Sequence, residues 1–122
     1  AYITGKILDD VMGRMLEDIV LLEVRKTAPS TMEAFKFKFD AGGEFDMVIY
    51  DKASKNCRIY EIKHSTEANE KQTLHLRDAE KCQIVEKRFG PISGKFVLYR
   101  GKDTFAEGVQ YLNVENFLCG LK

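Results

Sequence analysis

The sequence has few of the residues that mark secreted, zinc-binding or membrane-embedded domains. Its 122 residues contain no tryptophan, two prolines and three cysteines, which are Cys57, Cys82 and Cys119. The cysteines are odd in number and far apart, so they indicate neither a disulfide framework nor a zinc site. No signal peptide is apparent, and no apolar run approaches the roughly 18 residues of a membrane span. We therefore expect a cytoplasmic domain with no membrane partner.

An excess of charge of either sign is also missing. The 19 basic residues balance the 19 acidic ones, which argues against a domain that binds nucleic acid mainly through its overall charge. Local clusters of basic residues would still permit such binding. Gly42 and Gly43 do not continue into a Walker motif, so any ATPase activity must lie elsewhere in the full protein. The length suits one domain over residues 1–122, and the abrupt helical start suggests a fragment of a longer protein.

Hydrophobic periodicity predicts helices that alternate with strands. The expected order is a helix (6–26), three strands (35–39, 44–51 and 58–64), a helix (70–89), a strand (95–99), a short strand (109–112) and a closing helix (114–121). We read residues 101–108 as a loop. This order predicts an α/β fold in which helices flank a central mixed sheet of four to five strands.

The first helix has two apolar stripes. The main stripe comprises Ile7, Leu8, Val11, Met12, Met15, Ile19 and Leu22. The second comprises Gly13, Glu17, Val20 and Val24. A helix that is apolar on more than one side is expected to pack against both the sheet and a neighbouring element.

Two acids and a lysine lie on adjacent predicted strands. Alternation along a strand puts Asp46 on the face of Val48 and Tyr50, and puts Glu61 on the face of Lys63. If the two strands pair as a hairpin, Asp46, Glu61 and Lys63 can converge at the end of the sheet. The alternative is a surface hairpin with ordinary cross-strand charge pairs. The apolar residues around the acids weigh against that alternative, because buried charge is costly.

This combination of side chains suits metal-assisted hydrolysis of a phosphodiester. Asp46 and Glu61 would offer carboxylate oxygens to Mg²⁺ or Mn²⁺, and the backbone carbonyl of Ile62 could be a further ligand. Lys63 would orient the attacking water, help to deprotonate it and offset charge on the phosphate. The metal would lower the pKa of the water and stabilise the leaving oxygen.

Asp46, a gap of 14 residues and Glu61-Ile62-Lys63 together resemble the signature of the PD-(D/E)xK nuclease superfamily. More narrowly, the chain resembles the C-terminal nuclease-like domain of prokaryotic AAA+ ATPases. That resemblance rests on segments 13–17, 22–24, 43–49, 59–65 and 109–118. It implies a restriction-endonuclease-like fold of order αβββαβ, followed by a short strand and a helix. Phe45 stands where the superfamily's eponymous proline would be.

The resemblance also implies an acid from the first helix. Many members of the superfamily carry a glutamate there that enters the metal site, and Gly13-x-x-x-Glu17 matches this pattern. Glu17 is therefore expected to be a metal ligand and a catalytic residue. Glu23, at the edge of the main apolar stripe, is the rival candidate.

The resemblance implies a Mg²⁺-dependent nuclease domain that cleaves DNA and is joined to an AAA+ ATPase in the same chain. A non-catalytic nucleic-acid-binding or protein-binding regulatory module that keeps the fold is the alternative. A nuclease of a toxin–antitoxin system or mobile element is a third reading. The sequence leaves open DNA or RNA as substrate, and it leaves oligomer formation open.

Overall fold

The computed structural model describes the backbone of residues 5–121 and the side chains of that range apart from residues 5–9 and 70. The elements are α1 (Gly5–Thr27), β1 (Met32–Lys38), β2 (Glu44–Asp51), β3 (Asn56–Ile62), η1 (Glu70–Thr73), α2 (Ala79–Phe89), β4 (Ile92–Tyr99), β5 (Thr104–Ala106), β6 (Val109–Asn113) and α3 (Val114–Cys119). Apart from η1 and β5, this is the predicted order, and the α/β fold class is confirmed.

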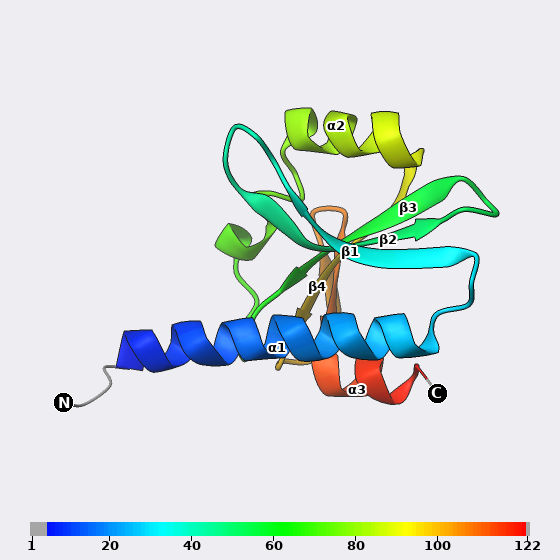
Figure 1. Ribbon diagram of the computed structural model, residues 1–122. Coiled ribbons are helices and arrows are strands. Elements are labelled where there is room, and N and C mark those ends of the chain that lie inside the picture. The colour runs from blue at the N-terminus through cyan, green and yellow to red at the C-terminus, as the bar shows by residue number, and fades with distance from the viewer. Residues whose placement is uncertain (1–4, 122) are drawn as a thin grey trace.

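One mixed sheet forms the centre of the molecule, between two layers of helix (Figure 1). Its strand order is β1-β2-β3-β4-β6-β5. β1, β2 and β3 form an antiparallel meander, and α2 carries the chain across to β4, which pairs with β3 in parallel. α2 covers one face of the sheet, whereas α1 and α3 cover the other. Each face therefore has its own apolar core.

The sheet has six strands rather than the four to five expected, because part of the predicted loop 101–108 is a strand. β5 pairs with β6 in antiparallel fashion through a two-residue turn. Both turn residues, Glu107 and Gly108, have positive φ angles, of 55° and 76°. Two consecutive positive φ angles suit the right-handed twist of a tight hairpin. A Glu-Gly turn is a weaker sequence signal than Asn-Gly or Asp-Gly, so this hairpin is easily missed.

The single helix predicted over residues 70–89 is wrong: two helical segments occupy this range. η1 is a short 3₁₀ helix, and Asn69 and Gln72 cap it reciprocally. α2 begins only after Asp78, whose side chain accepts hydrogen bonds from the backbone amides of Glu80 and Lys81. An aspartate that satisfies the free amides of a first turn sets a helix start inside an otherwise continuous pattern.

Only one of the two apolar stripes of α1 is buried, whereas both were expected to pack. The second stripe faces the sheet, with Val20 0% and Val24 3% exposed. The main stripe, which we expected to be buried, faces away from the sheet. Its described members are exposed: Val11 41%, Met12 39%, Met15 52%, Ile19 47% and Leu22 57%. Ile7 and Leu8 lie outside the described side chains.

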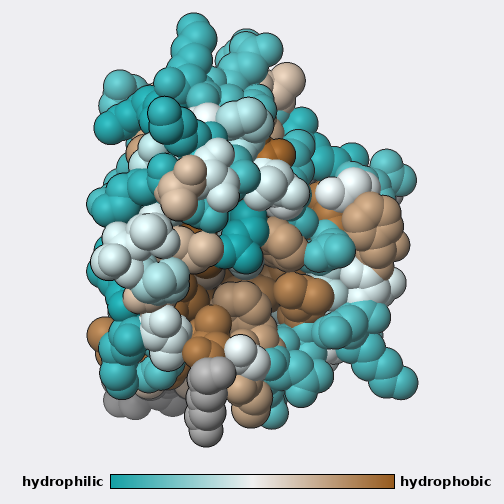
Figure 2. All heavy atoms as spheres, turned by 90° about the vertical axis from the view of Figure 1, so that its right-hand side faces the viewer, coloured by the Kyte–Doolittle hydropathy of each residue, from teal (hydrophilic) through white to brown (hydrophobic). Residues whose placement is uncertain are grey.

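An apolar groove lies near the end of α1. Figure 2 shows apolar side chains in a hollow on the side where α1 ends. Here a groove of about 220 Å³ lies between α1, the sheet and α3. Its lining includes Met32, Ile49, Tyr60, Phe117 and Leu121.

Among the described residues, no helix is both long and apolar enough to cross a membrane.

The orientation of α1 can be tested with two neighbouring residues. Val20→Ala is expected to lower the free energy of unfolding by about 2 kcal/mol, because it leaves a cavity in a closed core. Ile19→Ala removes more atoms from an exposed site and is expected to cost less than about 0.5 kcal/mol. Urea unfolding of both variants decides the matter. A larger loss for Ile19→Ala would mean that the main stripe is the buried one.

Candidate metal centre

A β-bulge in β2 redirects Asp46. Phe35 of β1 pairs with Val48, whereas Phe37 pairs with Phe45, so β2 has one extra residue between these two pairs. Such a bulge interrupts the alternation of side chains and re-aims one of them. The expectation that Asp46 shares a face with Val48 and Tyr50 is therefore wrong.

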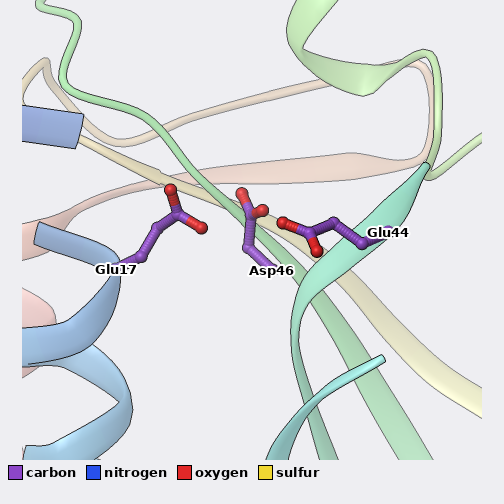
Figure 3. A group of neighbouring side chains, drawn as sticks. All are labelled: Glu17, Glu44 and Asp46. Carbon is purple, nitrogen blue, oxygen red and sulfur yellow. The ribbon is translucent and has the colours of Figure 1, made fainter. Parts of the chain in front are cut away.

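The residues beyond the bulge divide between the two cores. Val48 packs in the core under α2, and the Tyr50 ring lies 5.4 Å from that of Phe89 at the end of α2. Met47 and Ile49 pack in the core under α1. Asp46 points toward Glu17 of α1, as Figure 3 shows.

Asp46 also joins β2 to β3. Asp46 is only 6% exposed, and its Oδ2 accepts a hydrogen bond of 2.8 Å from the backbone amide of Ile62. A bond from a backbone amide fixes the direction of the carboxylate and leaves its other oxygen for a ligand. The contribution of Ile62 seen here is its amide; its carbonyl as a metal ligand stays a prediction.

Three carboxylates meet at this point. Glu17, Glu44 and Asp46 each offer an oxygen, and the three atoms lie within 4.8 Å of one another. In Figure 3, Glu17 approaches from α1 and Glu44 from the start of β2, with Asp46 between them. Lys36 of β1 is the neighbouring cation, with its Nζ 3.5 Å from Glu17 Oε1 and 3.7 Å from Glu44 Oε1. One lysine does not balance three acids, so the cluster carries excess negative charge.

Glu61 lies beside this cluster and is the most enclosed of the acids. It is 1% exposed, and its Oε1 makes no hydrogen bond among the described residues. Its other oxygen, Oε2, is 3.6 Å from the Nζ of Lys63, which is 39% exposed. Burial raises the pKa of Glu61 far above its ordinary value, and the adjacent Asp46 carboxylate raises it further, whereas Lys63 lowers it. A buried carboxyl oxygen with no partner is costly unless a proton or a cation compensates it.

Burial and the nearby acids also perturb Glu17. Partial burial, followed by the charge of Asp46, raises the pKa of Glu17 from 4.5 to about 7. Burial alone would lower the pKa of Lys36, but Glu17 and Glu44 outweigh it and raise that pKa. Perturbed acids that share one site are typical of functional centres.

The structure brings together the four side chains predicted as catalytic, which are Asp46, Glu61, Lys63 and Glu17. The rival Glu23 lies elsewhere and forms an exposed ion pair with Lys26 at 3.3 Å. The two histidines also have other partners: His64 Nε2 lies 3.2 Å from Arg100, and His75 Nδ1 lies 2.6 Å from Lys81.

Sequence analysis missed Glu44 and Lys36. A signal for both was present. Glu44 lies two residues before Asp46 at the start of the same predicted strand, and Lys36 alternates with the half-buried Phe35 and the buried Phe37. Both side chains were therefore candidates to lie near Asp46 at this end of the sheet.

The molecule is thus an α/β domain with a cluster of acids where α1 meets β2 and β3. The chain belongs to the DUF4143 family, described as a domain of unknown function, whose family model matches residues 12–117. No curated protein and no solved structure matches the chain.

The acidic cluster predicts an unusual dependence of stability on pH. The folded state keeps a proton on Glu17 up to about pH 7, whereas the unfolded chain releases it near pH 4.5. The folded state therefore binds more protons between these values, and the free energy of unfolding falls as pH rises. Glu17 is expected to contribute about 1 to 2 kcal/mol of this loss after allowance for solvent screening, and the raised pKa of Glu61 adds to the loss in the same direction.

Urea unfolding in EDTA at pH 5 and pH 8 measures this loss. Glu17→Gln should reduce the difference between the two pH values, whereas Glu33→Gln should leave it unchanged, because Glu33 is exposed and pairs with Lys52. Millimolar Mn²⁺ should restore stability at pH 8 more than at pH 5, since protons and metal compete for the carboxylates. Stability that rises with pH in EDTA would contradict the assignment.

Proposed function

We propose that this domain is a metal-dependent nuclease of the PD-(D/E)xK type. The observation that carries the proposal is the convergence of Glu17, Glu44 and Asp46 within 4.8 Å, beside the buried Glu61 and its partner Lys63. A surface hairpin with ordinary charge pairs would leave its acids solvated, whereas Asp46 and Glu61 are 6% and 1% exposed. Concentrating buried negative charge destabilises the fold, and a bound cation would offset that cost.

The donor set suits Mg²⁺ or Mn²⁺. Hard divalent cations prefer carboxylate oxygens and keep several waters. Glu17, Glu44 and Asp46 supply such oxygens without any thiolate or imidazole. Asp46, Glu17 and Glu44 would hold the ion, and Glu61, which lies beside them with its Oε1 unpartnered among the described residues, would be a further donor. A cation bound there would lower the pKa of the attacking water and stabilise charge on the leaving oxygen.

The protein's own groups would position the substrate and manage protons. Lys63 lies against Glu61 and remains partly open to solvent, so its ammonium can meet a phosphate oxygen or orient the attacking water. Lys36 holds Glu17 and Glu44 in place through its two ion pairs. Asp46 is oriented by the amide of Ile62. Each role rests on a contact within the described residues.

A lysine and a histidine lie beside the start of β2 and support a phosphate-containing substrate. A side chain at Gly43 would meet Lys81 Nζ at 2.8 Å and His75 at 3.2 Å, so both groups lie against the residue that precedes Glu44. Lys81, Lys38 and Arg88 line a groove of about 520 Å³ over the face of the sheet that α2 covers. The same groove contains acids, which suits a local backbone contact rather than strong general attraction.

The proposed setting is an AAA+ ATPase in the same chain, acting on DNA. This rests on the resemblance of segments such as Gly43–Ile49 and Ile59–Ser65 to the nuclease-like domains attached to such ATPases. The low net charge supports a domain that depends on a larger protein for much of its affinity for nucleic acid.

Cleavage of labelled single-stranded and duplex DNA in Mn²⁺ or Mg²⁺ tests the proposed activity. Asp46→Asn, Glu61→Gln and Lys63→Met are each expected to slow cleavage about 100-fold or more, because each removes a group from the reacting centre. Glu33→Gln is the matched control, with cleavage unchanged. Activity that survives all three substitutions would come from another site or from a contaminant.

Calorimetric titration with Mn²⁺ separates an inactive site from a missing one. The wild-type chain is expected to bind the metal, and Asp46→Asn to lose most of the affinity. Binding without cleavage of DNA or RNA would favour the alternative, a non-catalytic regulatory module. An absence of binding at millimolar metal in the presence of DNA would count against the nuclease as a whole.

A further inference from the structure

Gly13 lies in the interior of α1, where a glycine is unfavourable. The helix runs from Gly5 to Thr27, so Gly13 is far from both ends and caps neither of them. Glycine is among the least favourable residues within a helix, because its backbone loses the most freedom on folding. Close packing does not require it either. Apart from its own stretch of helix, no heavy atom of the described residues would lie within 4 Å of a Cβ built at Gly13.

The face of α1 that carries Gly13 also carries Glu17. Four residues make slightly more than one helical turn, so Gly13 lies beside Glu17, about 6 Å farther along the axis. Along this face the exposure increases toward the N-terminus: Val20 is 0% exposed, whereas the side chain of Glu17 is 16% exposed. In Figure 1 the first turns of α1 extend beyond the ends of the strands. The open space at Gly13 therefore adjoins the candidate metal ligand Glu17 on the side away from the core.

Two cations border the acidic cluster and remain open to solvent. The side chain of Lys36 is 34% exposed, and its Nζ lies 3.5 Å from Glu17 Oε1. The side chain of Lys63 is 39% exposed, and its Nζ lies 3.6 Å from Glu61 Oε2. Each ammonium group can therefore meet a phosphate oxygen without leaving its acid.

A polymeric substrate needs more room than a metal ion with its waters. When one phosphate of a nucleic-acid strand lies at the metal, the neighbouring nucleotides lie outside the acidic cluster. The elements that border the cluster must leave space for them. On the side of α1, Gly13 is the residue next to Glu17 on the same face, and it has no side chain. Glycine is the residue that allows a ligand to approach the backbone closely.

We propose that Gly13 provides clearance for the nucleic-acid strand beside the scissile phosphate, so that the sugar-phosphate backbone passes against the backbone of α1. This role rests on the proposed nuclease function, because it concerns the substrate of the same centre. Gly13 supplies no catalytic group. It is a positioning residue, and the fold accepts an unfavourable residue in the helix in exchange for access to Glu17.

Substitutions at Gly13 separate this role from a structural one. Gly13→Ala is expected to raise the melting temperature by about 3 °C, because alanine favours the helix and nothing obstructs its methyl group. The same variant is expected to lower kcat/KM for the labelled DNA about threefold, and Gly13→Leu at least tenfold, because the substrate is displaced from the metal. A purely structural glycine would give the reverse pattern, in which activity follows stability.

Two further measurements locate the effect. Calorimetric titration with Mn²⁺ should give the same affinity for the wild-type chain and both Gly13 variants, since the carboxylates are unchanged. Met15→Phe is the matched control: it enlarges a side chain that is 52% exposed, two residues along and therefore on the opposite side of α1. Its kcat/KM should equal that of the wild-type chain.

The outcomes distinguish this role from the nuclease function itself. If both Gly13 variants cleave DNA as fast as the wild-type chain while Asp46→Asn is inactive, the clearance role is wrong and the nuclease remains. If Gly13→Ala loses affinity for Mn²⁺, the space serves the metal and its waters rather than the strand, which also overturns the role. If the wild-type chain cleaves neither DNA nor RNA, the proposed function fails, and the role of Gly13 fails with it.

Discussion

The site depends on the hydrogen bond from the amide of Ile62 to the carboxylate of Asp46. It joins β2 to β3 where the bulge has ended the regular alternation of side chains. It also holds a buried negative charge in place close to Glu17, Glu44 and Glu61. Like charges in a weakly solvated place repel one another, so the rest of the structure must hold them together. β2 and β3 fix the positions of Glu44, Asp46 and Glu61, and the packing of α1 on the sheet fixes Glu17.

The two layers of helix have different tasks in this arrangement. α2 closes the core over β1, and the Asp78 cap sets where α2 begins. α1 closes the other core through Val20 and Val24, and the same face of the helix delivers Glu17 to the acids. The opposite face of α1 remains apolar and uncovered. One face of this helix thus supplies an acid to the candidate metal centre, whereas the other face is an exposed apolar stripe.

Much of the fold follows from local pattern. The three strands predicted at 35–39, 44–51 and 58–64, the strand at 95–99 and the closing helix at 114–121 all appear in the structure near these positions. The motif of Asp46, Glu61 and Lys63 was also apparent, because acids within apolar strands are costly without a role. The break before α2 and the β5 hairpin were missed, since a continuous apolar period hid Asp78 and a Glu-Gly turn is a weak signal.

The sequence by itself determined which residues are apolar, which strands are adjacent and which acids have no obvious place in a core. Only the tertiary structure decided which stripe of α1 is buried, because both stripes are apolar and the choice depends on the fit to the sheet. Only the tertiary structure revealed that a bulge turns Asp46 toward α1. The extra residue opposite Lys36 cannot be recognised from the pattern of apolar and polar residues in β2. For the same reason the acids Glu17 and Glu44 became neighbours only when helix and strand packed together.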